Sequence, residues 1–466
     1  MAKTARFEMD MCSGPLLKKL IIYTLPLLLT NVLQLTFNMA DIIVLGSLVS
    51  DDAVAAVGAT GALINLIIGL FVGLSVGANV LVARCVGSGD KEKAHKIVGM
   101  SVLLGVTIGI LLGIVGFFCS RYFLEWMGCD AEVIDMATKY MRIYFVGMPI
   151  ILLYNFCAAI LRAVGDTVRP LIYLVVGGVV NVGLNVLFVT VFHKDVEGVA
   201  IATVVSQLIS AVLSVITLLK SDGYARFKWG NLRLYKAELA EMAKIGLPAG
   251  LQGCVFSLSN VVIQSTVNSF GKTVMTANTV ASQLDGFIYN AMNAVSLSAM
   301  AFVSQNLGAR NFDRINKTTK EALALAGVVG VVMGGMVLLL RVPLCNLFTD
   351  SQEVVQLACS RLYIIATTYF TCGLMDVMSN VMRGLGRSTT AMIVSLSGSC
   401  LFRILWIMTL CRWVHTLPML YWVYPVSWVL TFIIFAFMYK PTLKKVRSSA
   451  IAEDEAKLQA SAAQNA

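Results

Sequence analysis

The chain has 466 residues, of which 58% are hydrophobic and 13% charged, and its formal net charge is +10. A soluble globular protein has about 25% charged residues. This composition therefore excludes a soluble globular protein and favours a helical membrane protein. The basic residues sort by loop rather than gathering into one binding face, so we expect no nucleic-acid partner.

Long apolar blocks, separated by short charged or Gly-rich loops, follow one another from near the N-terminus to residue 439. Each is long enough to cross a bilayer as a helix. The predicted fold is therefore an all-α polytopic membrane protein with twelve transmembrane helices, near residues 17–46, 53–83, 95–118, 135–162, 169–192, 196–219, 243–269, 275–306, 317–340, 354–383, 389–412 and 418–439.

The basic residues indicate the orientation of these spans. Most of the 36 Lys and Arg residues lie at the N-terminus, in the even-numbered loops and at the C-terminus. The positive-inside rule then places both termini in the cytoplasm, which requires an even number of spans. The first apolar block is too long, and too polar on one face, to be a cleavable signal peptide.

An internal repeat relates the two halves of the chain at an offset of 221 residues. The run ValAlaArgCysValGlySerGlyAsp from Val82 matches ValSerGlnAsnLeuGlyAlaArgAsn from Val303. Further matches pair Glu132 with Glu353, the run ArgAlaValGlyAsp from Arg162 with ArgGlyLeuGlyArg from Arg383, and, with a slip of one residue, Pro26 with Pro248.

The repeat predicts two six-helix lobes of the same orientation, because six is an even number of crossings. We predict an N-terminal lobe at 1–220, a cytoplasmic linker at 221–240, a C-terminal lobe at 241–440 and a cytoplasmic tail at 441–466 that is disordered or loosely helical.

No sequence feature indicates a bound cofactor. The GlySerGly run at 87–89 lacks the Lys-Ser/Thr of a P-loop and follows no strand. The eleven cysteines show neither CxxC nor Cys/His spacing, so we expect neither a zinc site nor a disulfide framework. Any pumping must then be driven by an ion gradient or by a partner.

The first apolar block carries a polar stripe. Asn31, Gln34, Asn38 and Asp41 follow one another at steps of three, four and three residues, which places them on one face of a helix. A carboxylate within a span costs several kcal/mol unless it faces protein or water. This helix is therefore expected to turn its stripe toward an interior cavity.

Amide and hydroxyl side chains in the same half are candidate neighbours of Asp41. Asn181 and Asn185 share a helix face at i, i+4, while Asn155 and Thr203 lie in other spans. One carboxylate with several neutral oxygens suits a proton or a bare Na⁺, with Asp41 as the candidate metal ligand. The alternative is that these amides only hydrogen-bond helices together.

The second half carries a second set of polar residues within predicted spans. These residues line either a substrate wall or a second ion site; the alternative is internal salt bridges, such as Asp376 with Arg383 or Arg403. The candidates are Gln264, Asp285, Asp376 and Asn380, with Gln34 and Asn38 from the first half; Tyr154, Met148, Tyr289 and Met292 are candidate apolar or aromatic substrate contacts.

Several runs together resemble the multidrug and toxic compound extrusion (MATE) family over nearly all twelve spans. They are the 26–41 helix, the run from Val82, LeuArgAlaValGlyAspThrValArgPro from Leu161, AsnValGlyLeuAsn from Asn181, GlyValAlaIleAlaThr from Gly198 and the run from Val303. The resemblance implies cation-coupled export of organic cations and other drug-like amphiphiles by alternating access, and a bacterial inner-membrane location.

The DinF-like bacterial pattern places the cation site at Asp41, Asn155, Asn181 and Thr203, with an acid as its fifth member. Asn185 stands where that acid is usual. The resemblance thus implies one titratable group at this site and favours one monovalent cation, H⁺ or Na⁺, per cycle.

Two other functions were weighed. A flippase for lipid-linked saccharide would need basic residues in the cavity, and only Arg403 is plainly available. A membrane enzyme would need paired acids, a His cluster or a nucleophile at membrane depth, and no such constellation is present in the sequence. We expect a monomeric transporter whose partners are small-molecule organic cations or drugs and the lipid bilayer.

Overall fold

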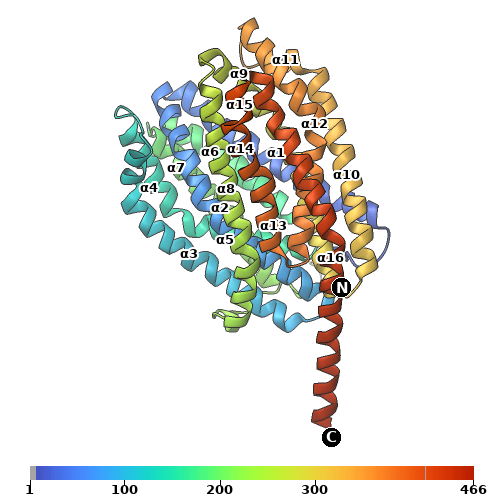
Figure 1. The fold of residues 1–466 in the computed structure, drawn as a ribbon. Helices are drawn as coiled ribbons and strands as arrows, with labels where there is room; N and C mark the ends of the chain where they lie inside the picture. Colours follow the sequence, from blue (N-terminus) through green and yellow to red (C-terminus); the bar gives the residue numbers. More distant parts are fainter. Residues whose placement is uncertain (1–6, 415, 466) are drawn as a thin grey trace. The chain divides into compact units, whose positions relative to one another are not determined.

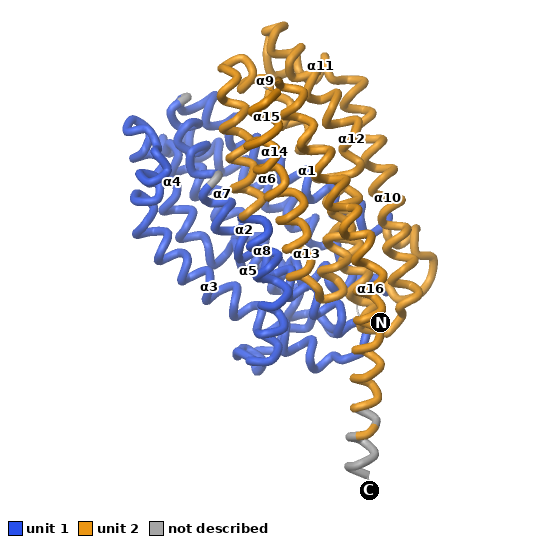
Figure 2. Tube along the Cα trace, in the orientation of Figure 1, with its two compact units in different colours: residues 1–10, 21–254 blue, residues 11–20, 255–466 orange. Residues whose placement is uncertain are grey.

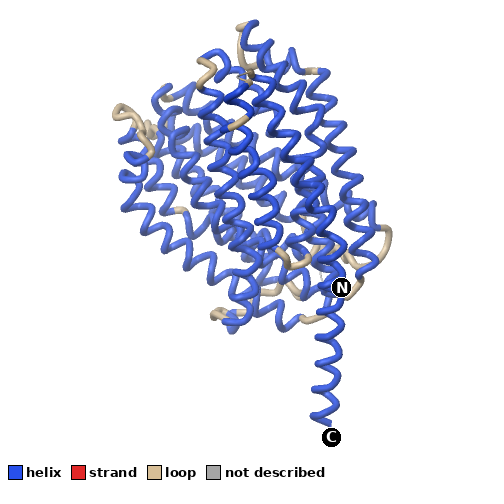
Figure 3. Tube along the Cα trace, in the orientation of Figure 1, coloured by secondary structure: helices blue, strands red, loops and turns tan. Residues whose placement is uncertain are grey.

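The computed structural model describes residues 7–414 and 416–465, except for the side chains at 51, 62, 457, 458 and 460–465. This part of the chain is helical throughout, with no strand (Figures 1 and 3). The helices are α1 Leu16–Leu48, α2 Asp51–Ser88, α3 Lys91–Trp126, α4 Ile134–Val146, α5 Met148–Ala163, α6 Val168–Thr190, α7 Val196–Lys220, α8 Lys236–Asn268, α9 Lys272–Gly308, α10 Phe312–Leu339, α11 Arg341–Asn346, α12 Gln352–Gly384, α13 Ser388–Ser395, α14 Phe402–Met408, α15 Leu410–Trp413 and α16 Leu417–Asn465, with short turns η2 Trp229–Asn231 and η3 Leu396–Leu401.

Within the described residues, eleven helical segments are long and apolar enough to cross a membrane, and a bent pair raises the count to twelve. The bent pair is α4 and α5, which meet at 51° around Gly147. Pro149 stands in the first turn of α5, where its missing N–H cannot continue the helical bonding of α4. The predicted all-α polytopic fold is therefore confirmed, with the predicted span 135–162 broken into two helices.

The C-terminal tail is helical, which is one of the two alternatives predicted for it. The structure continues α16 as one helix from Leu417 to Asn465, so 441–466 is not a separate loose segment in its described part (Figure 1). Pro441 lies within this helix. Beyond it the chain carries basic residues at 444, 445 and 447 and acidic residues at 453–455. Lysine, arginine, glutamate and alanine are strong helix formers and favour a solvated helix here.

The repeat recurs in the local structure of the turns. Asp90 caps α3 by accepting the N–H of Lys93 at 2.9 Å, and Asn311, 221 residues later, caps α10 by accepting the N–H of Arg314 at 3.1 Å. The turns that end α5 and α12 each contain a glycine with positive φ, Gly165 and Gly386. The same turn chemistry in both halves confirms the two-lobe repeat.

Helix packing follows the repeat as well. Gly109 and Gly113 of α3 let the helix approach the backbone of Pro149 and Phe145. Their repeat equivalents on α10, Gly330 and Gly334, let it approach the backbone of α12 at Phe370 and Ala366. Small residues at four-residue spacing are the usual means of close helix packing in a membrane, where lipid supplies no hydrophobic driving force between helices.

Two compact units divide the chain at residues that differ from the predicted lobes (Figure 2). Unit 1 comprises 1–10 and 21–254, and unit 2 comprises 11–20 and 255–466. The boundary at 254 lies inside α8 rather than in the 221–240 linker, because Gly246 and Gly250 pack the first part of α8 against the backbone of α2 in unit 1.

The short segment 11–20 belongs to unit 2 for an equally local reason. The Met11 N–H donates to Gln305 Oε1 at 3.3 Å, and the Met11 carbonyl accepts from Asn306 Nδ2 and from Arg314 Nε. Arg314 also donates to the carbonyl of Ser13 at 2.7 Å. These hydrogen bonds fix the lead-in of α1 to the α9–α10 turn.

Candidate functional site

Unit 1 brings four of the predicted site residues into one hydrogen-bonded cluster. Asn185 Nδ2 on α6 donates to Asp41 Oδ1 on α1 at 2.5 Å. Asn185 Nδ2 also lies 3.4 Å from Asn181 Oδ1, one helical turn away, and Asn181 Nδ2 lies 3.4 Å from Thr203 Oγ1 on α7. The cluster joins three helices, and its closest contact is the one that reaches the carboxylate.

The cluster offers more acceptor oxygens than donors. Asn185 is fully buried, and its Oδ1 has no hydrogen-bond partner among the described residues. A buried acceptor without a donor is costly, and it stands on the same side chain that contacts Asp41. Carboxylate, amide and hydroxyl oxygens are the ligands of a hard monovalent cation, and the carboxylate alone can accept a proton. The chemistry of these residues therefore suits either H⁺ or Na⁺.

The apolar surroundings of Asp41 include two tyrosines that the sequence reasoning missed. Tyr140 and Tyr144 of α4 lie within electrostatic range of Asp41, and their rings stack with centroids 6.2 Å apart. Tyr140 belongs to a buried cluster that also contains Val189 of α6, the helix of the two amides, and Val199 of α7, the helix of Thr203. The i, i+4 spacing of the two tyrosines was the available signal, although the same spacing is common in any helix core.

Among the described residues, three predicted residues of the first half are not joined to this cluster by hydrogen bonds. Asn155 Nδ2 donates to the Ile151 carbonyl of its own helix at 2.8 Å, and no hydrogen bond to the Asp41 cluster is found among the described residues. Gln34 and Asn38 are exposed side chains on α1. The structure therefore joins Asp41, Asn181, Asn185 and Thr203 by hydrogen bonds, whereas the hydrogen bond found for Asn155 lies within its own helix.

The polar residues of unit 2 divide into three separate groups rather than one continuous surface. The first group is made of amides. Gln264 Nε2 donates to Asn268 Oδ1, and Asn278 Nδ2 of α9 donates to Gln264 Oε1, both at 2.9 Å. This group ties α8 to α9 and contains no charge.

The second group is a buried ion pair whose cation was not predicted. Arg361 Nη2 of α12 lies 2.9 Å from Asp285 Oδ2 of α9, and each side chain is only 7% exposed. Asp285 is predicted from the sequence as part of a substrate wall or second ion site, and Arg361 is not among the predicted residues. A basic residue in the first half of a long apolar helix was the available signal.

The third group surrounds Asp376 on α12. Asn380, one turn along, donates from Nδ2 to Ser296 Oγ at 2.9 Å and accepts from Arg383 Nη1 at 3.0 Å. Arg383 and Tyr289 lie within electrostatic range of Asp376. Of the predicted substrate contacts, Tyr289 is thus the one placed beside a carboxylate.

Among the described residues, Arg403 forms no ion pair, so the predicted alternative of a salt bridge with Asp376 is not found. The Arg403 side chain is buried, with only 3% exposed. Its guanidinium lies 4.8 Å from the ring centroid of Tyr424, and its Nε donates to Ser427 Oγ at 2.9 Å. A cation over an aromatic face is stabilised by the ring quadrupole, so α16 supplies both partners of this arginine.

Comparison with known proteins agrees with this architecture. The family model MatE matches the chain twice, at residues 26–187 and 248–409, which are 222 residues apart. The probable multidrug resistance protein YoeA of Bacillus subtilis is 26% identical over 386 residues, covering 81% of this chain and 83% of that protein. The multidrug export protein MepA of Staphylococcus aureus is 22% identical over 401 residues, covering 85% and 88%.

A solved structure shows the same fold. The crystal structure of a MATE protein in its bent conformation superposes with a TM-score of 0.89 at 20% identity, covering 97% of this chain and 100% of that one. At this identity the likeness concerns the fold alone. Among the described residues, no group of three or more His, Cys, Asp or Glu side chains is placed to hold a metal ion.

Proposed function

This chain belongs to the MatE family of multidrug efflux transporters, and from that premise we propose that it is a secondary antiporter coupled at Asp41. It exports organic cations and other drug-like amphiphiles in exchange for inward-moving H⁺ or Na⁺. The names of its relatives, a multidrug resistance protein and a multidrug export protein, support the substrate class.

One observation carries the coupling assignment. Asp41 lies within an apolar span, and the partner that the structure gives its carboxylate is the neutral amide of Asn185. A neutral donor leaves the negative charge uncompensated, and a charge at membrane depth is costly. Binding of H⁺ or Na⁺ removes that cost. The site therefore alternates between a form that holds the cation and a form that has released it.

The other acids in the spans suit this role less well. Asp285 already has a guanidinium at 2.9 Å, which compensates its charge without any transported ion. Asp376 lies near Arg383. Asp41 is therefore the carboxylate for which a transported cation supplies the missing positive charge.

The alternative of a lipid-linked saccharide flippase finds less support. That function requires basic side chains that face an anionic substrate. Arg361 is engaged by Asp285, and Arg403 is engaged by Tyr424 and Ser427. Arg361 and Arg403 thus each have partners within their own unit.

The test is transport by purified protein in vesicles loaded with a fluorescent organic cation, with a pH gradient and a Na⁺ gradient imposed separately. The wild type is expected to move the dye with at least one gradient. Asp41→Asn is expected to lose gradient-driven transport while inserting normally. Asp195→Asn, which changes an exposed loop acid, is the matched control. Normal gradient-driven transport by Asp41→Asn would contradict the assignment of Asp41 as the coupling residue.

A second variant separates coupling from simple helix attachment. Asn185→Leu keeps the side-chain size but removes both the hydrogen bond to Asp41 and the orphan acceptor. A hydrogen bond to a charged group contributes about 1.5–3 kcal/mol, so coupled transport should fall by about 10- to 100-fold. If Asn185 only holds α6 to α1, Asn185→Leu should lower the melting temperature. The loss of transport should then be explained by the smaller fraction of folded protein.

A further inference from the structure

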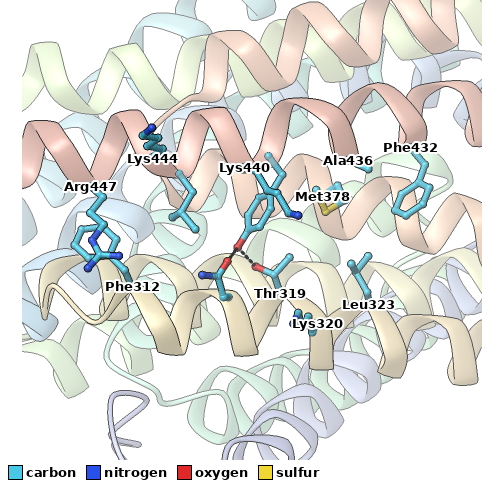
Figure 4. Close-up of a pocket in the computed structure, with 13 residues that line it drawn as sticks. Phe312, Thr319, Lys320, Leu323, Met378, Phe432, Ala436, Lys440, Lys444 and Arg447 are labelled. Carbon is cyan, nitrogen blue, oxygen red and sulfur yellow. Dashed lines mark hydrogen bonds between the residues drawn. The ribbon is translucent and has the colours of Figure 1, made fainter.

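Unit 2 contains a pocket of about 610 Å³ that includes none of the residues of the Asp41 cluster (Figure 4). It lies between α10 and α16, with Met378 of α12 at its base. Apolar and cationic side chains occupy different parts of it. Leu323, Phe432 and Ala436 lie toward one end, and Lys444 and Arg447 lie toward the other (Figure 4).

The sequence builds this arrangement from two facing helix stripes. Lys440, Lys444 and Arg447 follow at steps of four and three on α16, so they share one face. Lys320 and Leu323 on α10 contribute the opposite wall. The cationic stripe begins where the apolar run of α16 ends, next to Tyr439. Lysine and arginine at the end of a span lie at the membrane–water interface.

The cationic side chains of the pocket are not neutralised by the protein. Among the described residues, none of the four forms an ion pair, and the pocket lining contains no acid. Nearby acids are engaged elsewhere: Glu321 faces Lys317 at 3.8 Å, while Glu453 and Asp454 lie 3.0 and 3.1 Å from Arg310. The pocket is therefore positive, and it repels the organic cations that the transporter is proposed to export.

The uncharged polar groups in the wall are bonded to one another. The Tyr439 hydroxyl donates to Asn316 Oδ1 at 2.9 Å and lies 3.1 Å from Thr319 Oγ1 (Figure 4). The guanidinium of Arg447 lies 5.7 Å from the ring centroid of Phe312, which holds it at the pocket edge. The groups left to bind a ligand are thus cations at one end and an apolar surface at the other.

We propose that this pocket binds an anionic phospholipid of the surrounding membrane. Lys320, Lys440, Lys444 and Arg447 hold the phosphate headgroup, and an acyl chain lies along Leu323, Met378, Phe432 and Ala436. The charge is complementary to phosphate, and basic pockets between transmembrane helices at the interface are typical headgroup sites. The apolar end favours a lipid over a free anion, since a soluble phosphate would leave it empty.

The experiment measures lipid binding to full-length protein exchanged into a neutral detergent. Phosphatidylglycerol, phosphatidylcholine and inorganic phosphate are titrated separately, and bound species are counted by native mass spectrometry. We expect one phosphatidylglycerol site that phosphatidylcholine occupies at least tenfold more weakly and that inorganic phosphate does not fill. Equal binding of the two lipids, or full competition by inorganic phosphate, would overturn the proposal.

Variants locate the site. Lys440→Gln/Lys444→Gln/Arg447→Gln should weaken phosphatidylglycerol binding at least tenfold. The control Lys228→Gln/Lys236→Gln/Lys445→Gln removes the same charge from exposed positions outside the pocket and should change it less than twofold. Equal weakening by the two triple variants would show diffuse attraction and contradict a site.

Two further variants keep the test decisive if the triple variant folds poorly. Lys444→Gln and Lys445→Gln change neighbouring residues of α16, of which only the first lines the pocket. Lys444→Gln should bind phosphatidylglycerol more weakly than Lys445→Gln does. Ala436→Trp fills the apolar end without changing charge and should also weaken binding at least tenfold. Unchanged binding by Ala436→Trp would rule out the pocket as the acyl-chain site.

Discussion

Asp41 and Asp285 are both acids within apolar helices, yet their surroundings differ in charge. Asp41 accepts a hydrogen bond from a neutral amide, whereas Asp285 faces a guanidinium. Desolvation penalises both carboxylates. Only Asp285 has a cationic partner among the described residues, so it belongs to the architecture of unit 2, whereas Asp41 is the acid that we propose takes up the transported cation.

Removing Arg361 should therefore destabilise the protein. Arg361→Met leaves the Asp285 carboxylate buried and unpaired, which costs about 3–5 kcal/mol. Asp285→Leu/Arg361→Met removes both charges and should recover most of that loss. The measurement is the free energy of unfolding from SDS titration. A double variant no more stable than the single one would contradict the pair as the cause.

A second buried acid lies outside the spans. Asp166, in the turn between α5 and α6, is fully buried. Its Oδ1 accepts the backbone N–H of Arg169 at 3.0 Å, and its Oδ2 lies 3.2 Å from the Arg169 Nε. Burial raises the pKa of Asp166 to about 6, although Arg169 lowers it. Burial, and the charge of Asp166, also raise the pKa of the neighbouring Glu8.

This shift predicts that stability falls as the pH rises. The folded state holds the Asp166 proton up to about pH 6, whereas the unfolded chain releases it near the ordinary pKa of 3.8. The free energy of unfolding should thus fall by about 3 kcal/mol between about pH 4 and pH 6 and change little above that. In Asp166→Asn, only the pH dependence of stability that is due to Glu8 should remain. Melting temperatures measured over this pH range give the comparison. An unchanged slope in that variant would exclude Asp166.

At the scale of elements, close contact between α2 and the first part of α8 depends on glycine. A Cβ on Gly73 would overlap the backbone of Gly250, whereas a Cβ on Gly69, one turn earlier on the same helix, would meet nothing within 4 Å. The two glycines therefore differ in their structural roles. Gly73 allows a helix crossing, and Gly69 faces open space.

Alanine at these two positions should have opposite effects. Gly73→Ala forces α2 and α8 apart and should lower the free energy of unfolding by about 1–3 kcal/mol. Gly69→Ala should raise it by up to about 1 kcal/mol, because alanine loses less chain entropy in a helix. Unfolding of the two variants side by side gives the comparison. Equal destabilisation would mean that helix position, rather than the crossing, matters.

At the scale of the whole molecule, the repeat and the compact units do not coincide. The lead-in 11–20 comes from the first half of the sequence and belongs to unit 2, while 221–254 precedes or begins the second half and belongs to unit 1. The segment that begins each repeat therefore belongs to the compact unit that is formed mainly by the other repeat. Both lead-ins are fixed by short-range bonds and by close backbone packing.

The expected orientation can be tested directly. In a background whose partly exposed native cysteines are replaced by serine, Lys445→Cys should react with a membrane-impermeant maleimide only in permeabilised cells. Lys194→Cys, in the loop between α6 and α7, should react in intact cells, since an odd number of crossings separates the two positions. The reverse labelling pattern would contradict cytoplasmic termini.

The sequence alone predicted the helical class, the span positions and the repeat, because each depends on local hydrophobicity and on turn residues. It also predicted that α6 presents Asn181 and Asn185 on one face, since helical spacing is a local property. Asp41 could be singled out because a carboxylate within an apolar span carries a free-energy cost unless it faces protein or water.

Only the tertiary structure decided which polar residues meet. It joined Asp41 to Asn185 and left Asn155 bonded within its own helix. It paired Asp285 with Arg361, and placed Arg403 on Tyr424 and Ser427. It also moved the unit boundary into α8. These outcomes depend on helix rotation and on contacts between residues far apart in the chain, which the periodicity of a single helix does not specify.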